Sequence, residues 1–217
     1  MKEVAIAGGS GLIGGFLLDL LLSESSISKI YFVGRSKPKS NSTKIVFIPL
    51  SELSTKNEMN DVQLDAAFCC LGTTIKNAGS KEKFEAVDLG LVVEFAKASK
   101  SAQKFLVVSS LGANSKSSVF YNAVKGRMEE RVQSMGFKSS LIFRPSILTG
   151  PRKEFRLGEK IGIVVMSIFS PLMLGPMKKF RPIAAENVAK AMLNGWKSDV
   201  KGPVIIEGDE ILRLAKK

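Results

Sequence analysis

Short apolar runs alternate along the chain with longer segments whose apolar residues recur at helical spacing. The runs stop at glycine or polar residues, which is typical of strands buried on both faces of a parallel sheet. Apolar residues every three or four positions, as at Val87, Leu91 and Phe95, predict helices. The expected strands are Val4–Ile6, Ile30–Val33, Ile45–Ile48, Ala66–Leu71, Phe105–Val108, Leu141–Phe143 and Val204–Ile206. The expected helices are Leu12–Leu22, Phe84–Lys100, Tyr121–Met135 and Asn187–Trp196, with a closing helical turn at Glu210–Leu214.

This alternation predicts a single α/β domain over residues 1–217. Crossovers between parallel strands are right-handed, so the simplest topology is a Rossmann-like, doubly wound parallel sheet with helices on both faces. A length of 217 residues suits one domain with its own core. No internal repeat or low-complexity tract interrupts the pattern.

The composition is that of an ordinary globular protein with an excess of positive charge. Hydrophobic residues make up 45% and charged residues 24%, which argues against extended disorder. The chain has 32 Lys and Arg against 20 Asp and Glu, a net charge of +12 spread over small clusters. This excess fits an anionic ligand or a solvated basic face equally well. Nucleic-acid binding is not expected, because no recognition element gathers the basic residues.

The two cysteines, Cys69 and Cys70, are adjacent inside an apolar run. Neither a disulfide framework nor zinc-ligand spacing is available to them, so we expect reduced thiols and no metal site. The first apolar residues lead directly into a glycine-rich loop and do not resemble a secretory signal. We therefore expect a cytoplasmic protein.

The first strand is followed by a glycine-rich loop that opens a helix. Glycines allow a tight turn and let a diphosphate approach the amides at the helix N-terminus, where the helix dipole favours negative charge. This position after a strand and before a helix predicts dinucleotide binding. The alternative is a glycine-rich turn that binds no ligand. The loop residues are Gly8, Gly9, Ser10, Gly11, Leu12, Ile13 and Gly14.

The end of the second strand predicts which dinucleotide is preferred. A site that prefers NAD(H) offers an acidic residue there, whereas this chain has Gly34, Arg35, Ser36 and Lys37. Arg35 can bind a 2′-phosphate in bidentate fashion and Ser36 can add a hydroxyl donor. NADP(H) is therefore favoured, NAD(H) stays possible, and an exposed basic turn is the alternative.

Three further residues suggest proton-transfer chemistry after the fifth strand. Tyr121 and Lys125 are one helical turn apart on one face, so the lysine charge can stabilise a phenolate. Ser110, at the carboxyl end of its strand, can hydrogen-bond a substrate oxygen. Together they suggest carbonyl/alcohol redox chemistry with a nicotinamide, although a YxxxK spacing alone is common on exposed helices.

The motifs GGSGLIG, VSSLGA, YNAVK and FRPS follow one another in an order that resembles the short-chain dehydrogenase/reductase superfamily over nearly the whole chain. More narrowly, the stretch LGTTIKNAGSKEKFEAVD, together with VSSLGANSKSSVFYNAVKGRMEE and IFRPSIL, is similar to an atypical branch. That branch includes the Tat-interacting oxidoreductase proteins and is often labelled sugar-nucleotide epimerase-like. The closer similarity covers the middle of the chain and is weak beyond Gly150.

The resemblance implies further cofactor-binding residues. It places Leu71, Gly72 and Thr73 along the adenosine and nicotinamide ribose, and it implies that Lys125 also contacts that ribose. Residues Pro145 and Ser146 would flank the nicotinamide. The chain departs from the superfamily pattern after the third strand, where the sequence Pro49, Leu50, Ser51 replaces a frequent acidic residue.

The resemblance also implies a small C-terminal segment on the substrate side, approximately residues 150–181. Its apolar stretch Ile161–Leu174 is too short to span a bilayer and suggests a hydrophobic substrate or a covering helix. Contact with a membrane surface is the less favoured alternative, because basic residues flank the stretch.

Three functions stay open from the sequence. The favoured one is an NADP(H)-dependent oxidoreductase that acts on a small carbonyl or alcohol, as a monomer or homodimer. The second is a non-enzymatic NADPH-binding regulatory or assembly protein. A sugar-nucleotide epimerase is less favoured, because the chain is short and Arg35 favours the phosphorylated cofactor.

Overall fold

A seven-stranded parallel sheet forms the centre of the computed structural model, which describes residues 1–55, 58, 59, 61–150 and 181–217. The strand order is β3-β2-β1-β4-β5-β6-β9, and each neighbouring pair is parallel. The predicted doubly wound α/β fold is therefore confirmed. The strands are β1 (Lys2–Ala7), β2 (Ile27–Gly34), β3 (Ile45–Pro49), β4 (Ala66–Cys69), β5 (Lys104–Val108), β6 (Ser139–Arg144) and β9 (Gly202–Glu207).

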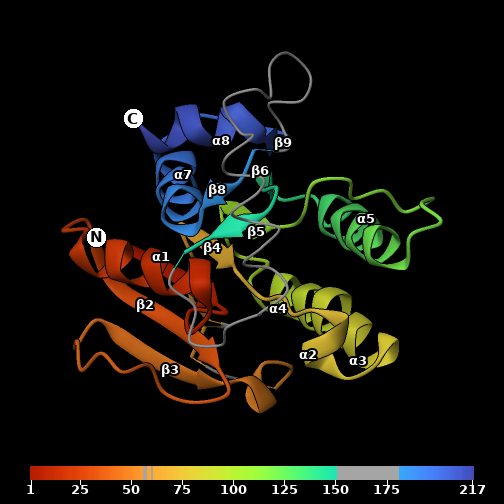
Figure 1. Ribbon diagram of the computed structural model, residues 1–217. Coiled ribbons are helices and arrows are strands. Elements are labelled where there is room, and N and C mark those ends of the chain that lie inside the picture. Colours follow the sequence, from red (N-terminus) through yellow and green to blue (C-terminus); the bar gives the residue numbers. More distant parts are fainter. Residues whose placement is uncertain (56–57, 60, 151–180) are drawn as a thin grey trace.

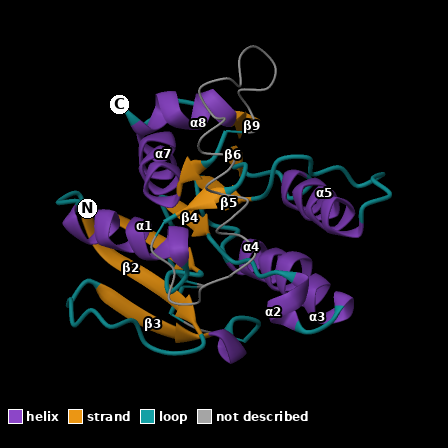
Figure 2. Cartoon of the chain, viewed as in Figure 1, coloured by secondary structure: helices purple, strands orange, loops and turns teal. Residues whose placement is uncertain are grey.

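Helices cover both faces of the sheet (Figure 1). Side chains alternate along β1, so that Val4 and Ile6 pack under one helical layer and Ala5 and Ala7 under the other. The first layer consists of α1 (Leu12–Ser23), α7 (Ala185–Lys197) and α8 (Gly208–Ala215), and the second is centred on α4 (Val92–Ala98) and α5 (Phe120–Gln133). Figure 2 shows these two layers on either side of the strands.

The expected helix over Phe84–Lys100 is built from three consecutive segments. These are α3 (Lys81–Glu85), the π-helical segment η2 (Ala86–Leu91) and α4. Hydrophobic spacing cannot distinguish this run from one α-helix, because a π turn inserts only locally into the helical ladder. The remaining short elements are η1 (Leu50–Glu52), α2 (Ile75–Ala78), β7 (Leu148–Thr149) and β8 (Ile183–Ala184).

The chain crosses from one side of the sheet to the other around β1, which lies between β2 and β4. Ligands of open α/β sheets bind where the strand order reverses, beyond the carboxyl ends of the strands. The opposite edge is closed by packing. There the ring of Trp196 meets Phe68 edge-on and lies under the ammonium of Lys2, while Lys104 donates to the Trp196 carbonyl over 2.8 Å.

The expected substrate-side segment begins at Gly150 and ends at Arg181, and residues 151–180 within it lie outside the described part of the chain. The apolar stretch Ile161–Leu174 belongs to that part. Among the helices that the structure does describe, none is long and apolar enough to pass through a bilayer.

Candidate functional site

The glycine-rich loop forms a tight cradle at the carboxyl end of β1. Gly8 has a φ of 77°, and a Cβ there would lie 2.5 Å from the backbone carbonyl of Cys70. A Cβ at Gly14 would overlap the carbonyl oxygen of Gly8. Both positions therefore require glycine, which explains how α1 can begin directly against the loop.

The N-terminus of α1 has the features of an anion-binding site. Its N-cap is Gly11, no side chain caps it, and its first turn contains no acidic residue. The amide of Gly15 donates to the carbonyl of Gly11 over 2.8 Å, so the amides of Leu12, Ile13 and Gly14 precede the first intrahelical donor. Ser10 and Gly11 are exposed beside them. Such a helix N-terminus is the kind of site that binds phosphate groups.

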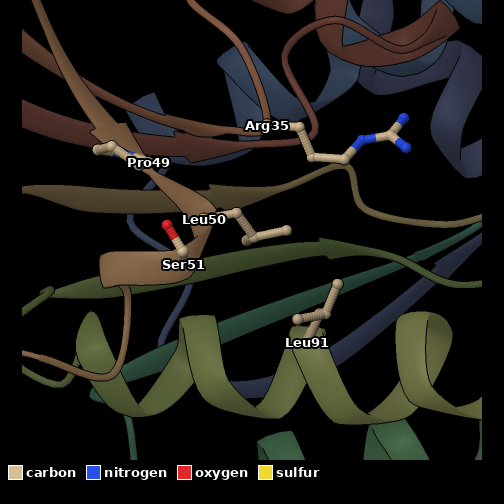
Figure 3. A pocket seen from close by; sticks show the side chains of 5 residues that line it. All are labelled: Arg35, Pro49, Leu50, Ser51 and Leu91. Atoms are coloured by element: carbon tan, nitrogen blue, oxygen red, sulfur yellow. The ribbon is translucent and has the colours of Figure 1, made fainter.

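A pocket lies at the carboxyl ends of β2 and β3, with Arg35 on one wall (Figure 3). Its volume is about 420 Å³, and Pro49, Leu50, Ser51 and Leu91 complete its lining. The side chains of Leu50 and Leu91 point toward one another across it. An apolar slot with a guanidinium at its side suits a flat heterocycle that carries an anionic substituent.

A buried ion pair joins η2 to α5 and contacts the loop after β4. The ammonium of Lys125 lies 2.6 Å from Oδ1 of Asp88, and the side chains are 4% and 0% exposed. The other carboxylate oxygen, Oδ2, accepts the amide of Thr73 over 2.8 Å. A Cβ at Gly72 would lie 3.7 Å from Nζ of Lys125. The structure thus brings together Lys125 and the loop residues Gly72 and Thr73.

Two opposed effects act on the charge of Lys125. Burial is the largest single effect and disfavours the ammonium, but Asp88 and, after it, Tyr121 together outweigh burial, and the pKa of Lys125 is raised above its ordinary value. Lys125 is therefore a buried cation at neutral pH. A positive charge is available beside Tyr121, together with its counter-ion.

Tyr121 lies in the first turn of α5, one turn before Lys125. Its half-buried ring packs against Phe84, with ring centroids 5.3 Å apart. Ser110 follows β5, the strand next to β4, and its buried hydroxyl has no hydrogen-bond partner in the part of the chain that the structure describes. A buried hydroxyl without a partner is costly unless a ligand satisfies it.

The residues after β6 frame the same edge of the sheet. The carbonyl of Pro145 accepts the amide of Leu111 over 3.0 Å, which ties this segment to the loop of Ser110. Pro145 is buried, and the hydroxyl of Ser146 donates to the carbonyl of Arg181. The hydroxyl of Ser146, which the resemblance places beside a nicotinamide, therefore already has a hydrogen-bond partner within the protein.

Arg144, the last residue of β6, is the centre of a second group of charges. It binds Glu129 of α5 at 2.5 Å and Glu207 of β9 at 2.9 Å. Glu129 also accepts the hydroxyl of Ser109, the residue before Ser110. The group fixes the strand end that carries Ser110, and the sequence pattern did not reveal it.

Asp88 is the principal residue at the site that the sequence analysis missed. The available signal was a carboxylate among apolar residues on the face of a helix that was expected to be buried. Buried carboxylates are rare unless paired, so its partner Lys125 could have been suspected.

The two cysteines lie next to this site. Cys69 is fully buried, and burial raises the pKa of its thiol to about 12. Cys70 is half-buried, and its sulfur lies 3.9 Å from that of Met192. Burial also raises the pKa of the Cys70 thiol well above its ordinary value, so both thiols stay protonated at neutral pH.

The doubly wound sheet and the glycine cradle define a Rossmann-like α/β protein, and the order of Ser110, Tyr121 and Lys125 along it resembles that of the short-chain dehydrogenase/reductases. No family model matches the chain. It is 34% identical to "Protein FMP52-1, mitochondrial" of Scheffersomyces stipitis, over 98% of each chain. It is 32% identical to "Protein HTATIP2" of Rattus norvegicus, over 99% of this chain and 90% of that protein. The chain belongs to the family of these FMP52 and HTATIP2 proteins.

Solved structures show the same fold. A crystal structure of human epimerase family protein SDR39U1 (isoform 2) with NADPH superimposes with a TM-score of 0.66 at 18% identity, over 94% of this chain and 73% of that one. At this identity the likeness concerns the fold.

The relatives correct the expected cytoplasmic location. Fungal FMP52 relatives are named mitochondrial, which contradicts that expectation. The expectation was wrong because it rested partly on reduced cysteines, and these indicate a reducing environment without distinguishing one such compartment from another.

Proposed function

We propose that this protein is an NADP(H)-dependent oxidoreductase that interconverts a small, hydrophobic carbonyl compound and its alcohol. The observation that carries the proposal is the buried ammonium of Lys125, one helical turn from Tyr121 and against the Gly72 loop at the ligand edge of the sheet. The Lys125–Asp88 pair beside Tyr121 is the electrostatic setting in which the tyrosine hydroxyl exchanges its proton.

The glycine cradle, the free α1 N-terminus and the pocket beside Arg35 support the cofactor part of the proposal. The cradle leaves room for a diphosphate, and the amides at the α1 N-terminus can donate to it. The pocket beside Arg35 suits an adenine that carries a 2′-phosphate. The fold relative SDR39U1 was solved with NADPH, and the fold relative MoeE5 with NAD. The absence of an acidic residue among Gly34, Arg35, Ser36 and Lys37 favours the phosphorylated form.

The chain's own residues have distinct roles in the proposed reaction. The hydroxyl of Ser110 binds the substrate oxygen, which satisfies a buried group that is otherwise without a partner among the described residues. Tyr121 gives a proton to that oxygen during reduction and takes it back during oxidation, and Lys125 orients the bound ribose. A bound nicotinamide would supply the hydride.

Turnover of NADPH with a panel of hydrophobic aldehydes and ketones tests the chemistry. We expect Tyr121→Phe to lower kcat by about 10²- to 10⁴-fold, the usual contribution of general acid–base catalysis. Loss of NADPH absorbance measures the rate. Tyr31→Phe is the matched control: it removes the same hydroxyl at the other tyrosine, which is hydrogen-bonded to Glu3, and should leave kcat unchanged.

Unchanged turnover in Tyr121→Phe would exclude Tyr121 as the proton donor. NADPH binding without turnover of any substrate in the panel would favour the non-enzymatic NADPH-binding protein instead. That outcome would separate the cofactor part of the proposal from the chemical part.

A further inference from the structure

Asp88 is buried without any contact with solvent at the centre of the candidate site. Its two oxygens have different partners: Oδ1 faces the ammonium of Lys125 at 2.6 Å, and Oδ2 accepts the amide of Thr73 at 2.8 Å. It belongs to the π-helical segment η2, and such segments recur at functional sites. Asp88 thus joins the helix that carries Tyr121 to the loop after β4.

The pair changes the charge that Tyr121 experiences. An unpaired ammonium close by would favour the phenolate strongly, because buried charges are weakly screened. Here the ammonium has a carboxylate in direct contact, so the pair beside Tyr121 carries no net charge. Loss of the tyrosine proton would leave the three groups with a net negative charge in a buried place.

We propose that Asp88 is a positioning residue that holds the Lys125 ammonium in place and, by offsetting its charge, controls how readily Tyr121 releases its proton. The inference rests on the proposed function only for the role of Tyr121 in turnover. The contacts among Asp88, Lys125 and Thr73 stand independently of it.

The Asp88–Lys125 pair is supported by the electrostatics of its surroundings. Burial acts against the Lys125 ammonium, yet its pKa is raised, with Asp88 as the largest favourable cause and Tyr121 next. A Cβ at Gly72 would lie 3.4 Å from Oδ1 of Asp88, so the absence of a side chain keeps the loop close to the pair.

Other ionisable groups on the packed elements are separately engaged. From β4, the Cys69 thiol faces the pair and is protonated at neutral pH, because burial raises its pKa to about 12. From α3, Glu85 pairs with Arg127 of α5 at 2.9 Å. Lys81 of α3 lies over the ring of Phe120. Further along α5, Glu129 is bound by Arg144. The ion pair beside Tyr121 is therefore the one that Asp88 and Lys125 form with each other.

A titration of tyrosinate absorbance tests the inference without cofactor or substrate. The chain has two tyrosines, and burial, together with the hydrogen bond to Glu3, raises the pKa of Tyr31 far above its ordinary value. The first ionisation seen on raising the pH therefore reports Tyr121. Tyr121→Phe, which should lose that first step, verifies the assignment.

We expect Asp88→Asn to lower the midpoint of the Tyr121 ionisation by about one pH unit or more, because the ammonium then acts unopposed. The double variant Asp88→Asn/Lys125→Met replaces the ion pair with a neutral pair and should return the midpoint to within about half a unit of the wild-type value. A midpoint that is unchanged or raised in Asp88→Asn overturns the inference.

Circular dichroism of each variant checks folding. If Asp88→Asn does not fold, the double variant decides alone. A midpoint close to the wild-type value supports cancellation of the two charges, and any larger shift overturns it. Since no turnover is measured, a protein that shows the expected shifts but oxidises no NADPH would refute the proposed function and leave this inference standing.

Discussion

At the scale of single residues, Arg35 is the residue on which the proposed preference for NADP(H) depends. It is exposed at the end of β2, makes no ion pair with the residues that the structure describes, and lines an apolar pocket. The guanidinium of an exposed arginine stays solvated, so it does not destabilise the fold. It is also available to bind an anion. Its position beside Leu50 and Leu91 links that anion to a flat apolar group.

We predict that Arg35→Ala weakens NADPH binding about 10- to 100-fold and leaves NADH binding nearly unchanged. The reason is that a hydrogen-bonded charge is worth about 1.5–3 kcal/mol, and only NADPH carries the phosphate that Arg35 would bind. Calorimetric titration with both nucleotides measures the difference. Lys37→Ala removes the same charge two residues further on and serves as the control. Equal losses for both nucleotides in Arg35→Ala would contradict this role.

The sequence could predict residues whose role is set by local spacing. Gly8 and Gly14 were expected at a tight turn and are required there, and Tyr121 and Lys125 are one helical turn apart as expected. Asp88 was not expected, because its importance comes from a partner 37 positions away (125 − 88) across two packed helices. Spacing along one helix carries no information about such a contact.

At the scale of elements, the contact between α1 and α7 ends in an ion pair. Glu24, just after α1, lies 2.5 Å from Lys197, the last residue of α7. The hydrogen bond from Lys197 is the main cause that lowers the pKa of Glu24. A lowered carboxyl pKa means that the pair stabilises the folded state above the unfolded pKa, and that this contribution is lost as the pH falls through the folded pKa.

We predict that Glu24→Gln lowers the free energy of unfolding by about 0.2–1 kcal/mol near neutral pH, as is typical of partly exposed pairs. The difference from wild type should disappear well below the ordinary carboxyl pKa of about 4.3, where Glu24 is protonated in both states. Urea unfolding at the two pH values measures it. Glu186→Gln is the control. It breaks the exposed Glu186–Lys190 pair, which lies within α7 and does not join two helices. A difference that persists in acid would refute the assignment.

The elements themselves were largely predictable. Strands buried on both faces give continuous apolar runs, and all seven expected strands are present within a few residues of their predicted ends. The π-helical segment Ala86–Leu91 and the short strands Leu148–Thr149 and Ile183–Ala184 were not predicted. Such elements are too short to produce a periodic pattern and depend on tertiary contacts.

At the scale of the whole molecule, Arg144 ties together β6, α5 and β9 through Glu129 and Glu207. The hydrogen bond with Glu129 is the main cause that raises the pKa of Arg144, so the guanidinium stays charged throughout the accessible pH range. The group joins the last strand of the sheet to the helix that carries Tyr121. It therefore connects the C-terminal part of the chain to the candidate site.

We predict that Arg144→Leu lowers the free energy of unfolding by about 3–5 kcal/mol, because Glu129 is then left buried without its counter-ion. Thermal unfolding should show a clearly lower Tm. Arg144→Lys keeps the charge but loses the bidentate geometry, so its free energy of unfolding should lie between those of the wild type and Arg144→Leu. A loss below about 1 kcal/mol in Arg144→Leu would show that the group contributes little to stability.

The lone indole of the chain gives these experiments an internal reporter. Trp196 lies against the residues that start β1 and β5, the ends of the strands remote from the glycine cradle. Its fluorescence should therefore follow loss of the packed sheet, and ligands that enter at the far edge will not touch the fluorophore.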